Sequence, residues 1–179
     1  KGIYDMKKFA QLQVTTETRT KDEQLIYKTT WAITFRGAGS FGGSAPPKRE
    51  DLSIPKDRPA DFRVEELVPN EQALLYRLSG DRNPLHADPE FAAKAGFTQG
   101  PILHGLASYG YAARAIIHGA LGGDASRLRR LDGQFSRPVW PGDTLITEGW
   151  RLDGGKIAWQ TSVAARPEPV ITRAWAETV

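Results

Sequence analysis

The feature of this sequence that most constrains its fold is a segment of small residues followed by a series of strand-like segments. From Gly105 to Ala120, apolar residues recur at helical spacing, and Gly, Ala and Ser occupy much of the remainder. Such a helix is poorly suited to a solvated surface, so the segment predicts a core helix that another backbone approaches closely. Strand patterns then follow at residues 127–137, 143–151, 156–166 and 170–177.

A central helix followed by consecutive strands predicts an α+β domain in which an antiparallel sheet wraps around the helix. The sequence Asp153-Gly154-Gly155 predicts a tight hairpin between two of the strands. Upstream, "FRVEELV", which begins at Phe62, predicts one further short strand.

Two short helices are expected between that strand and the core helix. Asn70 is predicted to cap the first helix, in which Leu74, Leu75 and Leu78 share one face and Gly80 ends the helix.

The second short helix begins after "Asp88-Pro89", which is a favourable pair for an N-cap and a first helical position. It is expected to end at Gly96.

The N-terminal part of the chain has a different character. Residues 10–42 are rich in Thr, Ile, Val, Tyr and Trp, which predicts strands, and a glycine cluster ends them. Residues 44–61 carry four prolines and mixed charges, which is typical of an extended linker. We therefore expect a partial N-terminal domain over 1–43, a linker over 44–61 and a complete domain over 62–179.

Composition limits the classes of function. A net charge of +3 over 179 residues suits a small anionic ligand, such as a nucleotide-bearing thioester, better than a nucleic acid. The absence of cysteine excludes disulfides and thiolate zinc sites. No apolar run approaches the roughly 20 residues that span a bilayer, so membrane insertion is not expected. A cytoplasmic location is the expectation.

The stretch "SGDRNPLHADPEF" places an acid, an amide and an imidazole close together, at Asp81, Asn83 and His86. Each has an ordinary interpretation: Asp81 and Asn83 are common turn residues, and a lone His86 is more often structural. Together, a carboxylate and an imidazole could hold one water molecule and move its protons, which is what hydration of a double bond requires.

The step His104-Gly105 is a second candidate, because it opens the predicted core helix. Unpaired backbone N–H groups at a helix start favour negative charge, so Gly105 could support a carbonyl oxygen as it becomes an enolate. The alternative is a glycine required only for close packing. His104 is a candidate substrate-binding or second catalytic imidazole, although the preceding apolar "PIL" favours a buried structural role.

Other chemistries are weakly supported. His86, Asp81 and Asp88 fit no standard metal-ligand spacing, so no metal ion is expected. The glycines near residue 40 do not form a dinucleotide-binding fingerprint, and no nucleophile elbow surrounds a serine. Arg130, in "RLRR", could bind phosphates, but a solvated strand end is the alternative.

Three segments, "YRLSGDRNPLHADPEFAAKAGF", "PILHGLASYG" and "FSRPVWPGDTL", resemble the motifs of the MaoC-like (R)-specific enoyl-CoA hydratases, which have the hot-dog fold. The resemblance covers residues 62–179 and implies the antiparallel sheet around a central helix. It also implies that residues 1–43 are the closing strands of a preceding, truncated hot-dog repeat, as in double-hot-dog members of the family.

The resemblance implies a role for each candidate. Asp81 and His86 would activate the water that adds to a trans-2-enoyl-CoA, with Asn83 as a polar neighbour, and the backbone N–H of Gly105 would support the thioester oxygen. The product would be an (R)-3-hydroxyacyl-CoA in fatty acid metabolism, formed without a cofactor. Which of Asp81 and His86 protonates the α-carbon stays open.

Two other classes of function remain alternatives at this point. The truncated first repeat favours a non-catalytic subunit that binds acyl thioesters, and a hot-dog thioesterase is the other alternative. Hot-dog units usually pair through their sheets, so pairing is expected, either within a fuller chain or as a homodimer.

Overall fold

The computed structural model describes residues 2–50 and 52–179, apart from the side chain of residue 167. These residues form two compact units that divide after Glu50, and each unit is described by itself.

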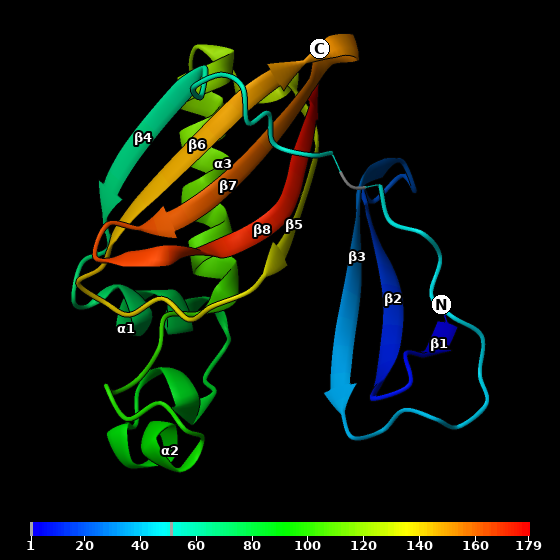
Figure 1. Ribbon diagram of the computed structural model, residues 1–179, viewed down its shortest axis with the longest axis vertical. Coiled ribbons are helices and arrows are strands. Elements are labelled where there is room, and N and C mark those ends of the chain that lie inside the picture. Colours follow the sequence, from blue (N-terminus) through cyan, green and yellow to red (C-terminus); the bar gives the residue numbers. More distant parts are fainter. Residues whose placement is uncertain (1, 51) are drawn as a thin grey trace. The chain divides into compact units, whose positions relative to one another are not determined.

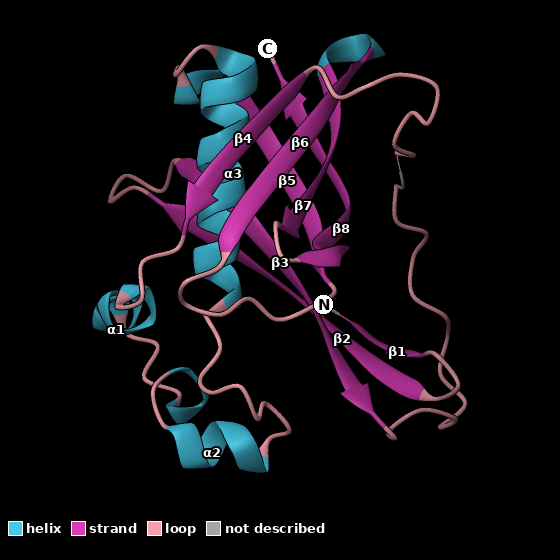
Figure 2. Cartoon of the chain, turned by 60° about the vertical axis from the view of Figure 1, so that its left-hand side comes forward, coloured by secondary structure: helices cyan, strands magenta, loops and turns pink. Residues whose placement is uncertain are grey.

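The C-terminal unit is a five-stranded antiparallel sheet with one long helix, α3, along one face (Figures 1 and 2). The order of the strands in the sheet is β4-β6-β7-β8-β5. The helix spans Gly105–Leu121, and a 3-10 turn at Asp153–Gly155 joins two of the strands. The strands are β4 (Phe62–Leu67), β5 (Leu128–Phe135), β6 (Thr144–Leu152), β7 (Lys156–Val163) and β8 (Arg166–Thr178). The predicted α+β hot-dog architecture is confirmed.

The small residues of α3 allow the sheet to approach it closely. Its buried face includes Ala107, Ala112 and Ala120, with Ile116 as a larger side chain in the core. Phe62 from β4 packs where two glycines leave space: a Cβ atom added at Gly119 of α3 would lie 2.5 Å from the Phe62 ring. A Cβ added at Gly149 of β6 would also collide with that ring. The helix is therefore approached closely at Gly119, by the side chain of Phe62 rather than by another backbone.

We predict that Gly119→Ala lowers the free energy of unfolding by about 1–3 kcal/mol, because the added methyl group forces Phe62 out of its position. The measurement is chemical denaturation. Gly110→Ala is the matched control on the same helix, since no atom lies within 4 Å of the added Cβ. It should stabilise the protein by about 0.4–1 kcal/mol. Equal effects of the two substitutions would contradict this account of the packing.

The first short helix differs from the prediction. α1 spans Gln72–Tyr76, and its N-cap is Glu71, without a side-chain hydrogen bond, rather than Asn70. A 3-10 turn, η1 (Arg77–Ser79), follows it, and Gly80 ends that turn with a φ of 120°.

The three leucines expected to share a face of that helix are exposed. Leu74 and Leu75 are each 54% exposed and Leu78 is 80% exposed, whereas the small Ala73 is the buried residue of α1.

The second short helix, α2 (Pro89–Lys94), matches its prediction. Asp88 Oδ1 accepts hydrogen bonds from the N–H groups of Glu90 and Phe91, at 2.9 and 3.2 Å. The C-cap is Ala95, and Gly96 follows it with a φ of 94°. Two further 3-10 turns are η2 (Pro84–His86) and η3 (Ala125–Arg127).

The N-terminal unit is a three-stranded antiparallel sheet in the order β1-β2-β3. Its strands are β1 (Gly2–Asp5), β2 (Phe9–Arg19) and β3 (Leu25–Arg36). The register aligns Ile3, Leu12 and Ile33 across the sheet and pairs Val14 with Trp31 and Ala10 with Phe35. We call the side of the sheet that these residues share the apolar face; Ile3, Trp31, Ile33 and Phe35 are exposed on it.

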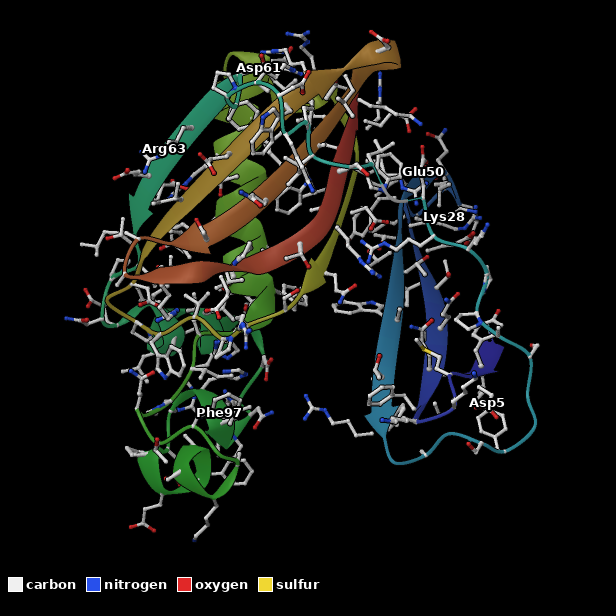
Figure 3. The ribbon with its side chains drawn as sticks, viewed as in Figure 1. Asp5, Lys28, Glu50, Asp61, Arg63 and Phe97 are labelled. Carbon is white, nitrogen blue, oxygen red and sulfur yellow. The ribbon has the colours of Figure 1, made fainter. Side chains whose placement is uncertain are left out.

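The opposite face of that sheet is polar. The hydroxyl groups of Thr15 and Thr30 lie 2.9 Å apart, and Lys28 Nζ lies 2.7 Å from Glu17 (Lys28 is labelled in Figure 3). The sheet is therefore amphipathic, and polar cross-strand pairs form the side that is suited to contact with water.

The segment predicted as a linker, 44–61, straddles the division between the units. Near its end, Arg58 donates to Asp61 at 2.8 Å and to the Arg151 carbonyl at 2.6 Å. Asp61, labelled in Figure 3, accepts the Arg151 N–H at 2.6 Å. These bonds, with that from Arg58 contributing most, lower the pKa of the Asp61 carboxyl. Residues 58–61 thus attach to the end of β6.

Within the described residues, no helix combines the length and the apolar character needed to cross a bilayer.

Candidate active site

The loop from Gly80 to His86 is shaped by its own polar side chains. Asp81 Oδ1 accepts the Asn83 N–H at 3.1 Å, and Asn83 Oδ1 accepts the Leu85 N–H at 3.1 Å, which caps η2. The turn chemistry expected of Asp81 and Asn83 is therefore present. These two hydrogen bonds use one oxygen of each side chain. The second carboxylate oxygen of Asp81 and the side-chain amide N–H groups of Asn83 remain available for other contacts.

His86 is buried at the end of that loop. Its Nδ1 lies 2.8 Å from the carbonyl oxygen of Ile102, so Nδ1 carries the proton and donates it. In the neutral ring, Nε2 is then an acceptor, which is the form required to take a proton from water.

His104 is also buried, and it lies directly against His86. The two rings stack with centroids 3.8 Å apart and an interplanar angle of 27°, and Tyr76 covers His104 at 4.6 Å. His104 Nε2 lies 3.2 Å from the Asp81 carbonyl oxygen, to which it donates, whereas its Nδ1 has no hydrogen-bond partner among the residues that the structure describes.

The three side chains of Asp81, His86 and His104 resemble a metal-binding set, because one donor atom of each lies within 4.8 Å of the others. The geometry opposes that use. Imidazole binds a metal in the plane of its ring, at about 2.0–2.1 Å. The centroids of the two rings lie 3.8 Å apart and their planes are inclined by 27°. The planes therefore intersect at a distance from the rings that is much longer than one metal–nitrogen bond, so one ion cannot lie in both planes at bonding distance. The residues present do not fit a shared metal ion.

Gly105 is the first residue of α3, directly after His104. A Cβ added to Gly105 would meet the Phe135 ring at 3.4 Å, near ordinary van der Waals distance. Close packing therefore gives no strong reason for a glycine here, and Gly105 itself is exposed. What the glycine does provide is open access to the N–H groups of the first helical turn.

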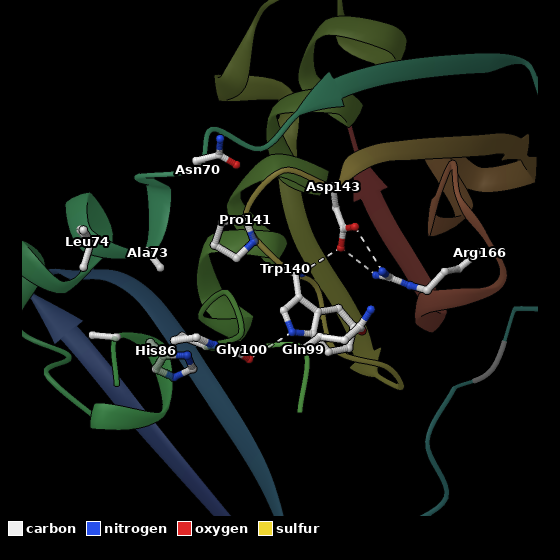
Figure 4. Close-up of a pocket in the computed structure, with 12 residues that line it drawn as sticks. Asn70, Ala73, Leu74, His86, Gln99, Gly100, Trp140, Pro141, Asp143 and Arg166 are labelled. Carbon is white, nitrogen blue, oxygen red and sulfur yellow. Dashed lines mark hydrogen bonds and ion pairs between the residues drawn. The ribbon is translucent and has the colours of Figure 1, made fainter. Parts of the chain in front are cut away.

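A pocket of about 410 Å³ borders His86 (Figure 4). Apolar groups of Ala73, Leu74, Pro101 and Pro141 contribute to its wall. Asn70, Gln99, Asp143 and Arg166 also line it, so the wall combines the imidazole with both apolar and polar groups.

Three residues that the sequence analysis did not single out hold the wall of this pocket in place. Arg166 forms a two-point ion pair with Asp143, at 2.7 and 3.1 Å, and lies over the Trp140 ring. Trp140 Nε1 donates to the Gly100 carbonyl at 3.1 Å. The run "VWPGDTL" contains two of them, but nothing local in it indicated their distant partners.

Arg130 is not part of this group of residues. It lies on β5, forms an ion pair with Asp132 at 3.4 Å and stacks over Trp175 at 4.5 Å. These contacts support the strand-end interpretation of Arg130 rather than a role in binding phosphate.

Comparison with known proteins identifies the class to which this fold and these residues belong. Residues 52–174 match the model of the MaoC like domain. The chain belongs to the MaoC-like dehydratase family.

Individual relatives agree. The chain is 42% identical over 182 aligned residues to the peroxisomal enoyl-CoA hydratase 2 of Arabidopsis thaliana, covering 95% of this chain and 57% of the relative. It is 44% identical over 141 residues to 3-hydroxyacyl-thioester dehydratase Y of Mycobacterium tuberculosis, covering 78% of this chain and 48% of the relative.

A solved MaoC-like dehydratase from Phytophthora Capsici superposes with a TM-score of 0.92 at 34% identity, covering 99% of this chain and 61% of that chain. The chain spans about half the length of the curated relatives it matches.

The burial of His104 generates a prediction about stability and pH. Burial, followed by the neighbouring His86, lowers the pKa of His104 from its ordinary value of 6.5. The unfolded chain then binds more protons than the folded chain as the pH falls through about 6.5, so the free energy of unfolding decreases with falling pH. Denaturation at about pH 7.5 and about pH 5.5 measures this decrease.

The control for that measurement is His104→Gln, which cannot titrate. Its free energy of unfolding should decrease less between the two pH values. The same decrease in both proteins would show that His104 is not its source.

Proposed function

We propose that this chain carries the catalytic part of an enoyl-thioester hydratase, which adds water to a trans-2-enoyl-CoA to give an (R)-3-hydroxyacyl-CoA, or catalyses the reverse dehydration, in fatty acid metabolism. The observation that carries the proposal is the arrangement of three elements: an exposed carboxylate at Asp81, an imidazole at His86 with its Nδ1 already occupied, and the open helix start at Gly105. The family to which the chain belongs supports the same reaction.

Hydration requires two proton movements and no change in oxidation state. One group removes a proton from water as the oxygen bonds to C3, and a second group delivers a proton to C2. Asp81 and His86 together can supply both, since His86 Nε2 is an acceptor in the neutral ring and the Asp81 carboxylate keeps one oxygen outside the turn. The assignment of each step to one residue stays open.

Negative charge collects on the thioester oxygen between these two proton transfers. The N–H of Gly105 and the positive end of the α3 dipole are available to stabilise it. The lack of a side chain at position 105 allows the thioester to reach the N–H. We further propose that the pocket beside His86, whose wall carries both apolar and polar groups, receives part of the substrate next to the imidazole.

Three further expectations concern the cofactor, the oligomeric state and the location of the protein. The reaction is redox-neutral and calls for no cofactor. The homodimer and the cytoplasmic location stay predictions; the names of some relatives place those proteins in peroxisomes.

We predict that Asp81→Asn and His86→Gln each lower kcat for hydration of crotonyl-CoA by about 100- to 10,000-fold, because each removes a proton-transferring group. The loss of absorbance of the conjugated thioester measures the reaction, and circular dichroism verifies the fold.

Asp88→Asn is the matched control. It makes the same acid-to-amide change a few residues away, and asparagine caps a helix as well as aspartate does. Full activity in Asp81→Asn and His86→Gln would refute the proposed roles. Release of free thiol would indicate the thioesterase, and tight binding of enoyl-CoA without turnover would indicate the binding subunit.

We also predict that Gly105→Ala retains the stability of the protein within about 1 kcal/mol but lowers kcat by about 100-fold or more, because the methyl group obstructs access to the N–H donor. Thermal unfolding and hydration kinetics on the same preparation test this separation. A loss of stability without a change in kcat would favour the packing interpretation of Gly105.

We propose that the N-terminal unit is part of a second hot-dog repeat. Its amphipathic three-stranded sheet supports this proposal, because one side is apolar and exposed as a sheet that packs against a helix would be. The greater length of the Phytophthora Capsici relative is consistent with it.

A further inference from the structure

We propose that His104 is a positioning residue, which fixes the Asp81–His86 loop against the start of α3 without touching the substrate. Its consequence for catalysis rests on the proposed function. The proposal begins from the burial of this side chain: only 1% of His104 is exposed. That burial favours a positioning role over the substrate contact that the sequence suggested.

The segment Ile102–His104 holds the loop at both ends. The Ile102 carbonyl accepts the His86 Nδ1–H at 2.8 Å, and His104 Nε2–H donates to the Asp81 carbonyl at 3.2 Å. We call these two bonds the two-point clamp. They bind the first and last residues of the proposed water-activating loop, Asp81 and His86. Their partners, Ile102 and His104, are only two residues apart in the chain.

The clamp is itself anchored in the core. Leu103, between its two gripping residues, is 2% exposed, and its N–H donates to the Val139 carbonyl at 2.7 Å. The next residue after His104 is Gly105, the first of α3. The clamp therefore sets the position of Asp81 and His86 relative to the N–H groups proposed to receive the thioester oxygen.

The surroundings of His104 suit a neutral, fixed ring. His86 stacks on it and Tyr76 of α1 packs beside it, while Asp81 and Arg77 are the charged groups whose fields act on it. With Nε2–H donating, Nδ1 is a buried acceptor that has no partner within the described part of the chain. A proton on Nδ1 would have no partner either, so the cationic form gains nothing from this environment.

The experiment compares His104→Gln with His104→Asn in the full chain. The glutamine amide nitrogen can reach the place of imidazole Nε2 and preserve the bond to the Asp81 carbonyl. The asparagine amide reaches only the place of Nδ1, so that bond is lost. We expect kcat for crotonyl-CoA hydration to fall by about 10- to 100-fold in His104→Asn with KM nearly unchanged, and to be largely retained in His104→Gln.

A merely structural role would give a different pattern. Both variants would lose activity in proportion to their unfolded fraction, and kcat per folded molecule would be equal. That result, or full kcat in His104→Asn, would overturn the proposal. A loss of affinity with unchanged kcat would also overturn it, in favour of substrate binding.

A second measurement does not depend on activity. The chain has three histidines, so nitrogen-15 spectra can resolve each imidazole. We expect the proton of His86 on Nδ1 and that of His104 on Nε2 in the unsubstituted protein. In His104→Asn, the amide of His86, which donates to the Asn83 carbonyl, should exchange with solvent at least tenfold faster, and in His104→Gln it should not.

The two measurements separate the two proposals. If the unsubstituted chain hydrates no enoyl-CoA, the proposed function fails, and the imidazole and exchange data alone decide whether the clamp exists. If the chain hydrates crotonyl-CoA while the amide exchange of His86 is equal in both variants, the clamp fails and the proposed function stands.

Discussion

The close packing of α3 against the sheet is the constraint on which the rest of this structure depends. Phe62 fits against the helix because positions 119 and 149 carry no side chain, so β4 and β6 approach the helix at a fixed depth. A packed core has little freedom to slide, since its side chains interdigitate at crystal-like density. The helix start at Gly105 therefore has a defined place, and the loops beside it take their positions from it.

The candidate site shows how a loop can be as well defined as a helix. Asp81 to His86 contains no long regular element, yet each of its end residues bonds to the segment Ile102–His104. Both imidazoles use one nitrogen on a backbone carbonyl, which sets the tautomer of each ring. The orientation of the His86 ring, with Nδ1 bonded to a backbone carbonyl, is then a property of the fold.

Much of the architecture could be predicted because its signals are local. Helical spacing with small residues predicted α3, and the pair Asp88-Pro89 predicted the start of α2. The leucines at 74, 75 and 78 are exposed, and this could not be predicted, because apolar spacing in a short helix does not reveal which of its faces the fold buries.

The unpredicted parts of the site are contacts between residues far apart in the sequence. The bond from His86 to Ile102 spans 16 positions, and the ion pair of Arg166 with Asp143 spans 23. Neither depends on a periodic pattern or a preferred turn residue. The residue types at the site were visible in the sequence, whereas the partner of each ring nitrogen required the folded backbone.

The amphipathic sheet of the N-terminal unit has a consequence for the behaviour of the chain in solution. Its apolar face exposes Trp31, Ile33 and Phe35. The strand β3 lies at the edge of the sheet, so the backbone N–H and C=O groups that point away from β2 take no part in the hydrogen bonds between the strands of this sheet. A long edge strand beside an exposed apolar surface is a template for pairing between molecules. Wherever that surface is uncovered, solubility will depend on protein concentration, and β3 offers a place where two molecules can pair.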